Sequence, residues 1–242
     1  KAKNKNQWLE VWEGHTKQVL DGAIYAEEIR QALLDKRVGK IKHDPGRPVH
    51  TFWDLGRRDK TAIWFAQTIG VEFNIINYYE DSLKKMPFYI GILQELSASE
   101  GYNYGMHNLP HDGAHETLSN ISPQNQLLKV YPKKVRIIQA PSKKFVGINA
   151  VRTIFPLCNF DEGKTKDGIM CLRRYCYKVD DETGTFSKEP DHDTPWSHGA
   201  DAMQTLALSF RSETASTKIR TVTTATKGVA LRNNNSNGWM NI

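Results

Sequence analysis

T-F-W-D-L-G-R-R-D-K-T-A-I-W-F, residues Thr51 to Phe65, joins two apolar runs through a short polar segment. The flanking runs, Val49 to Leu55 and Thr61 to Ile69, are rich in β-branched and aromatic residues and have the length of strands. The glycine and the charges between them are typical of a turn, so the stretch predicts consecutive strands joined by a short link. Asp54 ends the first strand and Asp59 follows in the link, where a buried carboxylate is costly unless a cation compensates it.

A third strand, Glu72 to Tyr79, follows a turn at Gly70, and three consecutive strands with short links predict an antiparallel meander. Beyond it, predicted helices and strands alternate, which is typical of an α/β layered domain. The last helix is expected to begin at Pro195 behind a Thr194 cap. The predicted elements of this second part are a helix over Pro87–Ser99, strands over Tyr104–Leu109 and Val135–Gln139, helices over Asn149–Leu157 and Gly168–Val179, and the last helix running through Phe210.

Breaks in this pattern divide the chain into three parts. Gln7 to Arg37 is predicted to be helical, and K-H-D-P-G-R-P, Lys42 to Pro48, ends that pattern with two prolines and a glycine. We therefore expect a helical segment over residues 1–46 and one α/β domain over residues 47–211. Residues 212–242 are rich in Ser, Thr and Asn without a core-forming pattern, so they are expected to be a flexible tail.

Composition narrows the class of protein. The 242 residues include 33 Lys and Arg against 27 Asp and Glu, and the net charge of +6 favours a polyanionic partner, although a basic surface without one gives the same count. Since no apolar run is long enough to span a bilayer and no secretory signal opens the chain, we expect no membrane association. Cys158, Cys171 and Cys176 lack metal-site spacing and indicate a reducing, cytosolic compartment.

Three aspartates occupy comparable positions in the predicted elements. Asp54 ends the first strand, Asp112 follows the fourth in L-P-H-D-G, and Asp201 lies in the last helix in W-S-H-G-A-D-A. Sites in α/β sheets gather beyond strand ends, so Asp54 and Asp112 would lie side by side if those two strands are neighbours. Carboxylates that close repel each other unless a cation bridges them, and oxygen ligands suit Mg²⁺ or Mn²⁺. Two such ions fit phosphoryl chemistry.

Each of these acids also has an ordinary structural interpretation. An aspartate after a strand is usually a turn former or a helix cap, Asp59 fits a hairpin turn, and Asp201 fits a solvated helix face. The predicted metal site therefore depends on the conjunction of the acids. The two histidines of H-D-G-A-H, His111 to His115, do not form the H-E-x-x-H of a zinc protease, and D-H-D, Asp191 to Asp193, is expected to be a loop.

The stretch from Thr117 to Phe160 contains no Asp or Glu. Folded beside the carboxylates, such a run would attract phosphates without reading bases, whereas its ordinary interpretation is a solvated basic face. We therefore predict contact with nucleic acid here. The run carries Lys129 and the six candidate DNA contacts Lys133, Lys134, Arg136, Lys143, Lys144 and Arg152.

Five short stretches, in order over roughly residues 8 to 210, give the chain a family resemblance. It resembles the C-terminal nuclease domain of the large terminase subunit of tailed double-stranded DNA bacteriophages. The W-D-L-G-x-x-D-x-T-A-I block is the most specific part of the resemblance. The stretches are V-W-E-G (Val11 to Gly14), G-A-I-Y-A-E-E-I (Gly22 to Ile29), T-F-W-D-L-G-R-R-D-K-T-A-I-W-F-A-Q (Thr51 to Gln67), L-P-H-D-G (Leu109 to Gly113) and S-H-G-A-D-A (Ser197 to Ala202).

The resemblance implies a ribonuclease H-like fold, in which helices flank a mixed sheet of an antiparallel three-strand meander plus parallel strands. It also implies divalent-metal cleavage of concatemeric double-stranded viral DNA during genome packaging. By position, the metal-binding acids of the family fall on Asp54, Asp112 and Asp201, and Asp59 resembles a secondary acid of some members. The R-R pair before Asp59 departs from many relatives.

The resemblance also implies partners. An ATPase motor would precede this chain, residues 1–46 would be the connector to it, and the absence of G-x-x-x-x-G-K-[ST] indicates that this chain does not itself hydrolyse ATP. Double-stranded DNA, the portal protein and the small terminase subunit would be further partners, in the cytoplasm of the infected bacterial host. The expected activity is an endonuclease of low sequence specificity.

Two other functions fit the same residues. A Holliday-junction resolvase or an integrase-type strand transferase shares the fold and the acids, and preference for branched DNA would separate it. The other alternative is a non-catalytic DNA-binding module of the packaging machinery, in which the aspartates are structural.

Overall fold

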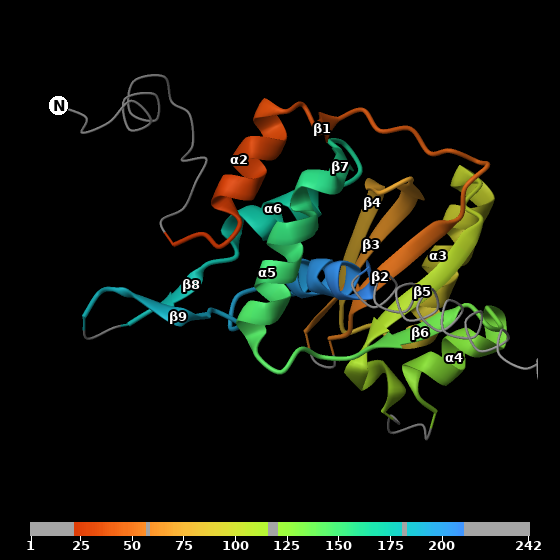
Figure 1. Ribbon diagram of the computed structural model, residues 1–242. Helices are drawn as coiled ribbons and strands as arrows, with labels where there is room; N and C mark the ends of the chain where they lie inside the picture. The colour runs from red at the N-terminus through yellow and green to blue at the C-terminus, as the bar shows by residue number, and fades with distance from the viewer. Residues whose placement is uncertain (1–21, 57–58, 116–120, 181–182, 211–242) are drawn as a thin grey trace, which may run out of the picture.

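A mixed sheet organises the part of the chain that the computed structural model describes, namely residues 22–56, 59–115, 121–180 and 183–210. Seven strands of these residues pair in the order β1-β7-β4-β3-β2-β5-β6 (Figure 1). Pairing is antiparallel within β2–β3–β4 and parallel between the other neighbours. The strands are β1 (Val38–Gly39), β2 (Val49–Asp54), β3 (Lys60–Ile69), β4 (Glu72–Ser82), β5 (Tyr104–Pro110), β6 (Val135–Ile138) and β7 (Cys158–Asp161).

The antiparallel meander predicted from the sequence is confirmed. β2 pairs with β3 so that Asp54 lies opposite Ala62, and β3 pairs with β4 along its whole length. β4 continues to Ser82, beyond the predicted end at Tyr79. Every residue of β3 from Thr61 to Gln67 is buried, because both faces of the sheet are covered at its centre.

Parallel pairing on the other side of β2 brings two of the candidate acids to one edge. β5 runs parallel to β2, with Phe52 opposite Asn108, so both strands end at the same edge of the sheet. The chain leaves β5 into a 3₁₀ turn, η1 (His111–Ala114), which contains Asp112. The condition under which Asp54 and Asp112 would lie side by side, that the first and fourth predicted strands are neighbours, is therefore met.

Helices pack on both faces of the sheet (Figure 1). A final helix, residues 197–210, is called the C-terminal helix below, and it is anchored by the Trp64 indole Nε1, which donates to the Gly199 carbonyl at 2.8 Å. One core contains buried side chains of α3 (Met86–Glu100) and α4 (Pro123–Val130). The other contains those of the C-terminal helix, α2 (Ala26–Leu34), α5 (Lys144–Ile154) and α6 (Lys166–Arg174).

Several helix boundaries differ from the prediction. The helix predicted over Pro87–Ser99 is α3, whereas the one predicted from Asn149 begins at Lys144 and closes in the 3₁₀ turn η2 (Phe155–Leu157). The last helix begins at residue 197 rather than at Pro195, with the Ser197 amide donating to the Thr194 carbonyl.

The helix predicted over Gly168–Val179 is wrong in its second half. α6 ends at Arg174, and Tyr175 takes an extended conformation that buries its ring fully. The chain then forms β8 (Tyr177–Val179), which pairs with β9 (Phe186–Pro190) as a separate hairpin. Burial of the tyrosine outweighs helical periodicity here, because it removes a large apolar surface from water.

Residues 22–46, the described part of the predicted connector, pack on the sheet. β1 extends the sheet by pairing with β7, and Tyr25 and Ile29 belong to the same core as Phe52. Of the helix predicted over Gln7–Arg37, the described residues form α2 only. Residues 1–21, the R-R pair at 57–58 and the predicted tail from residue 212 lie outside the described residues.

A helix that crosses a bilayer needs about 20 largely apolar residues. Within the described ranges, no helix combines that length with that composition.

Candidate active site

Three aspartates converge where β2 and β5 end. Asp54 is the last residue of β2 and Asp112 lies in η1 directly after β5. Asp201 comes from the first turns of the C-terminal helix, which packs on the same face of the sheet as Phe52. Because side chains alternate along a strand, Asp54 shares that face with Phe52. The charges of Asp201 and Asp112 both act on Asp54, so the three carboxylates share one electrostatic environment.

Asp54 ionises with difficulty in this environment. Burial raises the pKa of its carboxyl group from 3.8 to about 6, and the negative charges of Asp201 and Asp112 act in the same direction. A hydrogen bond with His198 opposes the shift but does not cancel it. A group that is costly to ionise without a nearby cation is a candidate for binding one.

His198 lies between two of the candidate acids. Its Nδ1 is 2.9 Å from Oδ2 of Asp54 and its Nε2 is 3.4 Å from Oδ2 of Asp59. The hydrogen bond with Asp54 raises the pKa of His198 above its ordinary value of 6.5. The sequence reasoning missed this residue, although S-H-G-A-D places His198 and Asp201 three apart, and therefore on one face of a helix.

Asp201 is held by donors on both of its oxygens. The Lys144 ammonium donates to Oδ2 at 2.9 Å, and the Gln204 amide donates to Oδ1 at 2.7 Å. His192, in the predicted D-H-D loop, lies 3.8 Å from Oδ2 through its Nδ1. Lys144, predicted as a DNA contact, is thus an immediate neighbour of a candidate metal ligand.

Asp112 differs from the other two acids. Its Oδ1 is buried and has no hydrogen-bond partner. A buried acceptor without a partner costs about 1–3 kcal/mol, and such atoms are rare in folded proteins. An oxygen of this kind, beside other carboxylates, suits a hard divalent cation such as Mg²⁺ or Mn²⁺.

The donor set therefore fits a divalent cation in its chemistry, but the ligands are engaged elsewhere. Among the described residues, no three His, Cys, Asp or Glu side chains lie close enough together to hold an ion as they stand. Asp54 is hydrogen-bonded to His198, and Asp201 is paired with Lys144. Joint binding by the three acids therefore requires side-chain movement, including the departure of Lys144 from Asp201.

The remaining candidate DNA contacts fall into two groups. The Lys134 ammonium donates to the Tyr104 carbonyl at 2.7 Å, and Arg152 donates to the Ile24 carbonyl at 2.8 Å and pairs with Glu28. The side chain of Lys134 therefore links its segment to β5, and that of Arg152 links α5 to the segment around α2. Of the others, Lys133 and Lys143 are exposed, as Lys134 also is, and Arg136 in β6 is half-buried.

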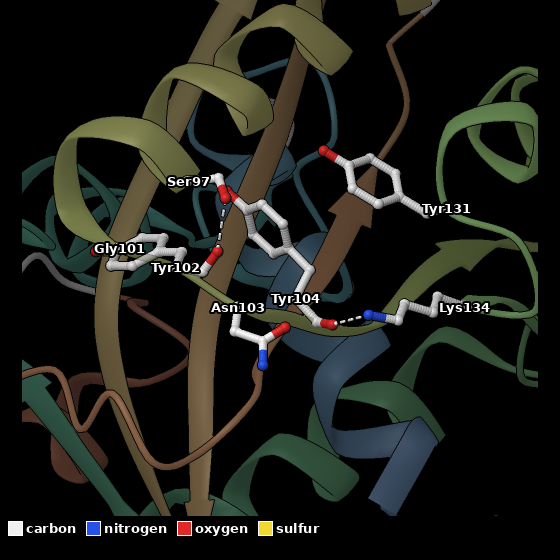
Figure 2. Close-up of a pocket in the computed structure, with 7 residues that line it drawn as sticks. All are labelled: Ser97, Gly101, Tyr102, Asn103, Tyr104, Tyr131 and Lys134. Atoms are coloured by element: carbon white, nitrogen blue, oxygen red, sulfur yellow. Dashed lines mark hydrogen bonds between the residues drawn. The ribbon is translucent and has the colours of Figure 1, made fainter.

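A cavity of about 370 Å³ lies at the other end of β5 (Figure 2). Ser97 donates to the Tyr102 carbonyl at 2.9 Å, and the hydroxyl of Tyr104 donates to the Leu93 carbonyl at 2.9 Å. None of the candidate acids lines it. The lining residues are Ser97, Gly101, Tyr102, Asn103, Tyr104, Tyr131 and Lys134.

Comparison with known proteins gives a likeness in structure. No protein-family model matches the chain, and no curated protein matches it in sequence. The large terminase of a thermophilic bacteriophage superposes with a TM-score of 0.57 at 16% identity, over 77% of this chain and 44% of that chain. The complex of the same terminase with ATP-γ-S gives 0.56 at 17% identity, over 77% and 45%. The Mn-bound large terminase nuclease domain of bacteriophage SPP1 gives 0.46 at 14% identity, over 69% and 91%.

This chain spans less than half the length of the thermophilic phage terminase that it matches. At this level of identity the likeness concerns the fold. The predicted ribonuclease H-like arrangement, a mixed sheet of a meander plus parallel strands flanked by helices, is confirmed.

Proposed function

We propose that the chain is the nuclease part of a large terminase, a divalent-metal-dependent endonuclease that cuts concatemeric double-stranded viral DNA with low sequence specificity during packaging, in the cytoplasm of the infected bacterium. One observation carries the proposal. Asp54, Asp112 and Asp201, from three distant parts of the chain, share one end of the sheet, and Oδ1 of Asp112 is buried without a partner. The fold likeness to the large terminase of the thermophilic phage supports the same class.

Asp54, Asp112 and Asp201 would hold Mg²⁺ or Mn²⁺, with Asp59 as a further acid at the rim. Two divalent cations, when bound to such acids, supply an activated water and stabilise the leaving 3′ oxygen of a phosphodiester. The raised pKa of Asp54 supports this assignment, because a nearby cation would favour its ionised form.

Other residues of the site position the acids. His198 fixes the orientation of Asp54 through the 2.9 Å hydrogen bond, and its proton offsets part of the negative charge. Gln204 fixes Asp201 in the same way through the bond to Oδ1. The acids are therefore arranged before substrate arrives, which reduces the reorganisation needed during reaction.

The basic residues near the site would hold the phosphate backbone of DNA. Lys133 and Lys143 are the exposed candidates, Arg136 is a half-buried one, and Lys144 would join them when it leaves Asp201. Lys134 and Arg152 would do so only by giving up their present partners. Contacts of this kind bind DNA without selecting a sequence.

Residues 1–46 would connect this domain to the ATPase domain of the same polypeptide, with residues 212–242 as a tail behind the nuclease domain. The portal protein and the small terminase subunit would be the other protein partners. These assignments follow from the proposed family.

Plasmid cleavage in Mn²⁺ tests the proposed activity. Asp54→Ala should abolish cleavage while the variant still unfolds cooperatively, and Asp167→Ala, which removes an exposed acid of α6, should cleave like the unaltered chain. Cleavage retained by Asp54→Ala would remove Asp54 from the site. Linear duplex and four-way junction should be cut at similar rates, and strong preference for the junction would indicate a resolvase instead.

A further inference from the structure

Where α5 contacts the C-terminal helix, the positively charged ammonium of Lys144 is already paired with a candidate metal ligand, Asp201. Nζ of Lys144 lies 2.9 Å from Oδ2 of Asp201, and Gln204 occupies Oδ1. Both oxygens of Asp201 therefore have donors. Asp112 presents the opposite case, since its Oδ1 has none.

The local packing holds Lys144 in this position. Lys144 is the first residue of α5, and Gly147, one turn later, faces Gln204 one turn after Asp201. A Cβ at Gly147 would collide with Oε1 of Gln204, so a side chain here would force the Gln204 amide, which bonds to Asp201, to move. The Lys144 side chain is 34% exposed and Asp201 is 22% exposed, so the pair lies at the rim, where the ammonium has open solvent beside it.

We propose that Lys144 is an internal competitor for the cation at Asp201, an inference that rests on the proposed function. An ammonium and a divalent cation at the same carboxylate oxygen repel each other, so Lys144 must leave Oδ2 before Asp201 helps to hold an ion. The two ions of the proposed site are therefore unequal. An ion held by Asp54 and Asp112 would not meet this competitor, whereas an ion that needs Asp201 would bind more weakly because it would have to displace Lys144. The displaced ammonium is then free to contact a phosphate of the DNA.

Direct binding of Mn²⁺ tests this competition without measuring cleavage. Free Mn²⁺ is titrated by electron paramagnetic resonance against the unaltered chain, Lys144→Met and Lys144→Arg. Lys144→Met should tighten the weaker Mn²⁺ site about fivefold, the size expected for a partly exposed ion pair. Lys144→Arg keeps a cation at the same place and should bind like the unaltered chain.

A matched control separates the contact from net charge alone. Lys166→Met removes the same formal charge from the exposed start of α6 and should change Mn²⁺ affinity by less than about twofold, because exposed charges are screened. Equal affinities of Lys144→Met and Lys166→Met would overturn the competition, as would weaker binding by Lys144→Met. If the unaltered chain binds no Mn²⁺ at all, the proposed function itself fails.

A second measurement covers the case in which Lys144→Met does not fold. In the unaltered chain, the side-chain NMR signal of Lys144 should shift during a Mg²⁺ titration. The shift should be half complete at the Mg²⁺ concentration that half-fills the weaker site. Identification of that signal uses Lys144→Arg, in which it disappears. A Lys144 signal that stays unchanged while Mg²⁺ saturates the site would overturn the proposal.

Discussion

The two ends of β5 differ in how their polar groups are satisfied. At the start of the strand, around the cavity, Lys134, Ser97 and Tyr104 donate to backbone carbonyls of the protein itself. At its end, Asp112 keeps a buried oxygen without a partner, and Asp54 has a pKa raised by burial and by neighbouring carboxylates. The start of the strand also has an unpaired buried atom, the Tyr102 hydroxyl, but that group is neutral, whereas the unpaired oxygen at the end belongs to a carboxyl group among other acids.

The difference shows which of the two is built to take a ligand. Ser97, Tyr104 and Lys134 at the cavity already bond within the protein, so a small molecule or ion that engaged them would cost those bonds. Carboxylates that repel each other gain a great deal from a cation. Unsatisfied charge is therefore a better guide to function here than the volume of the cavity.

The largest expected effect is on cleavage, and it should appear in a variant at the end of β5 but not in one at its start. Asp112→Asn should lower the rate of plasmid cleavage in Mn²⁺ by at least about a hundredfold, because a neutral amide is a poorer metal ligand than a carboxylate. Tyr104→Phe, at the cavity, should stay within about twofold of the unaltered chain. Similar losses in both variants would mean that the two ends do not differ in function.

Metal binding should stabilise the folded chain through the acids at the end of β5 and not through the cavity at its start. At a Mn²⁺ concentration about a hundred times the dissociation constant, the folded chain should gain about 2.7 kcal/mol, which raises the melting temperature by roughly 5–10 °C. Asp112→Asn should lose most of this rise, and Tyr104→Phe should keep it. A rise of equal size in Asp112→Asn would place the stabilising ion elsewhere.

The pH dependence of the metal-free chain sharpens the comparison. The folded pKa of Asp54, about 6, lies above the ordinary value of 3.8, so its contribution to stability is complete below pH 3.8 and is lost as pH rises through 6. The pKa of His198 is also raised above its ordinary value of 6.5, so the favourable contribution of His198 is likewise lost as pH rises through its folded pKa. Both groups therefore make the unaltered chain less stable as pH rises.

Asp54→Asn removes the part of this dependence that comes from the carboxyl group. Its free energy of unfolding relative to the unaltered chain should rise by about 1–2 kcal/mol between about pH 5 and pH 8, measured by urea unfolding in the presence of a chelator. A difference that stays constant, or that falls with rising pH, would contradict the electrostatic description of Asp54.

The smallest expected effect lies at the cavity. Tyr104→Phe removes the hydroxyl that donates to the Leu93 carbonyl, and it should lower the free energy of unfolding by about 1 kcal/mol at every pH from about 5 to 8. Urea unfolding with and without Mn²⁺ measures it. A change that depended on Mn²⁺ would connect the cavity to the acids.

Most of the sheet could be predicted from the sequence because its signals are local. The meander of β2, β3 and β4 follows from apolar runs separated by turn residues, and β5 from the run Tyr104 to Leu109. β1 and β7 are two and four residues long, and they exist because each pairs with a distant segment. Neither segment has the run of β-branched residues that predicted β6, which is also four residues long.

The candidate site could be predicted only in part. From their positions at strand ends, Asp54 and Asp112 were predicted to lie side by side if their strands were neighbours, and the resemblance supported the inclusion of Asp201. The roles of His198, Gln204 and Lys144 depend on how the C-terminal helix and α5 pack on the sheet, which the sequence does not specify locally. Lys144 was predicted as a DNA contact from its charge, whereas its nearest partner in the fold is Asp201.

Anomalous diffraction from crystals of this chain soaked in Mn²⁺ is the most direct measurement of whether these acids bind cations. We expect a peak in contact with the carboxylates of Asp54 and Asp112, with Asp201 turned toward the same position. No peak between these acids at millimolar Mn²⁺, or peaks only at other places on the surface, would contradict the claim that they hold a divalent cation together.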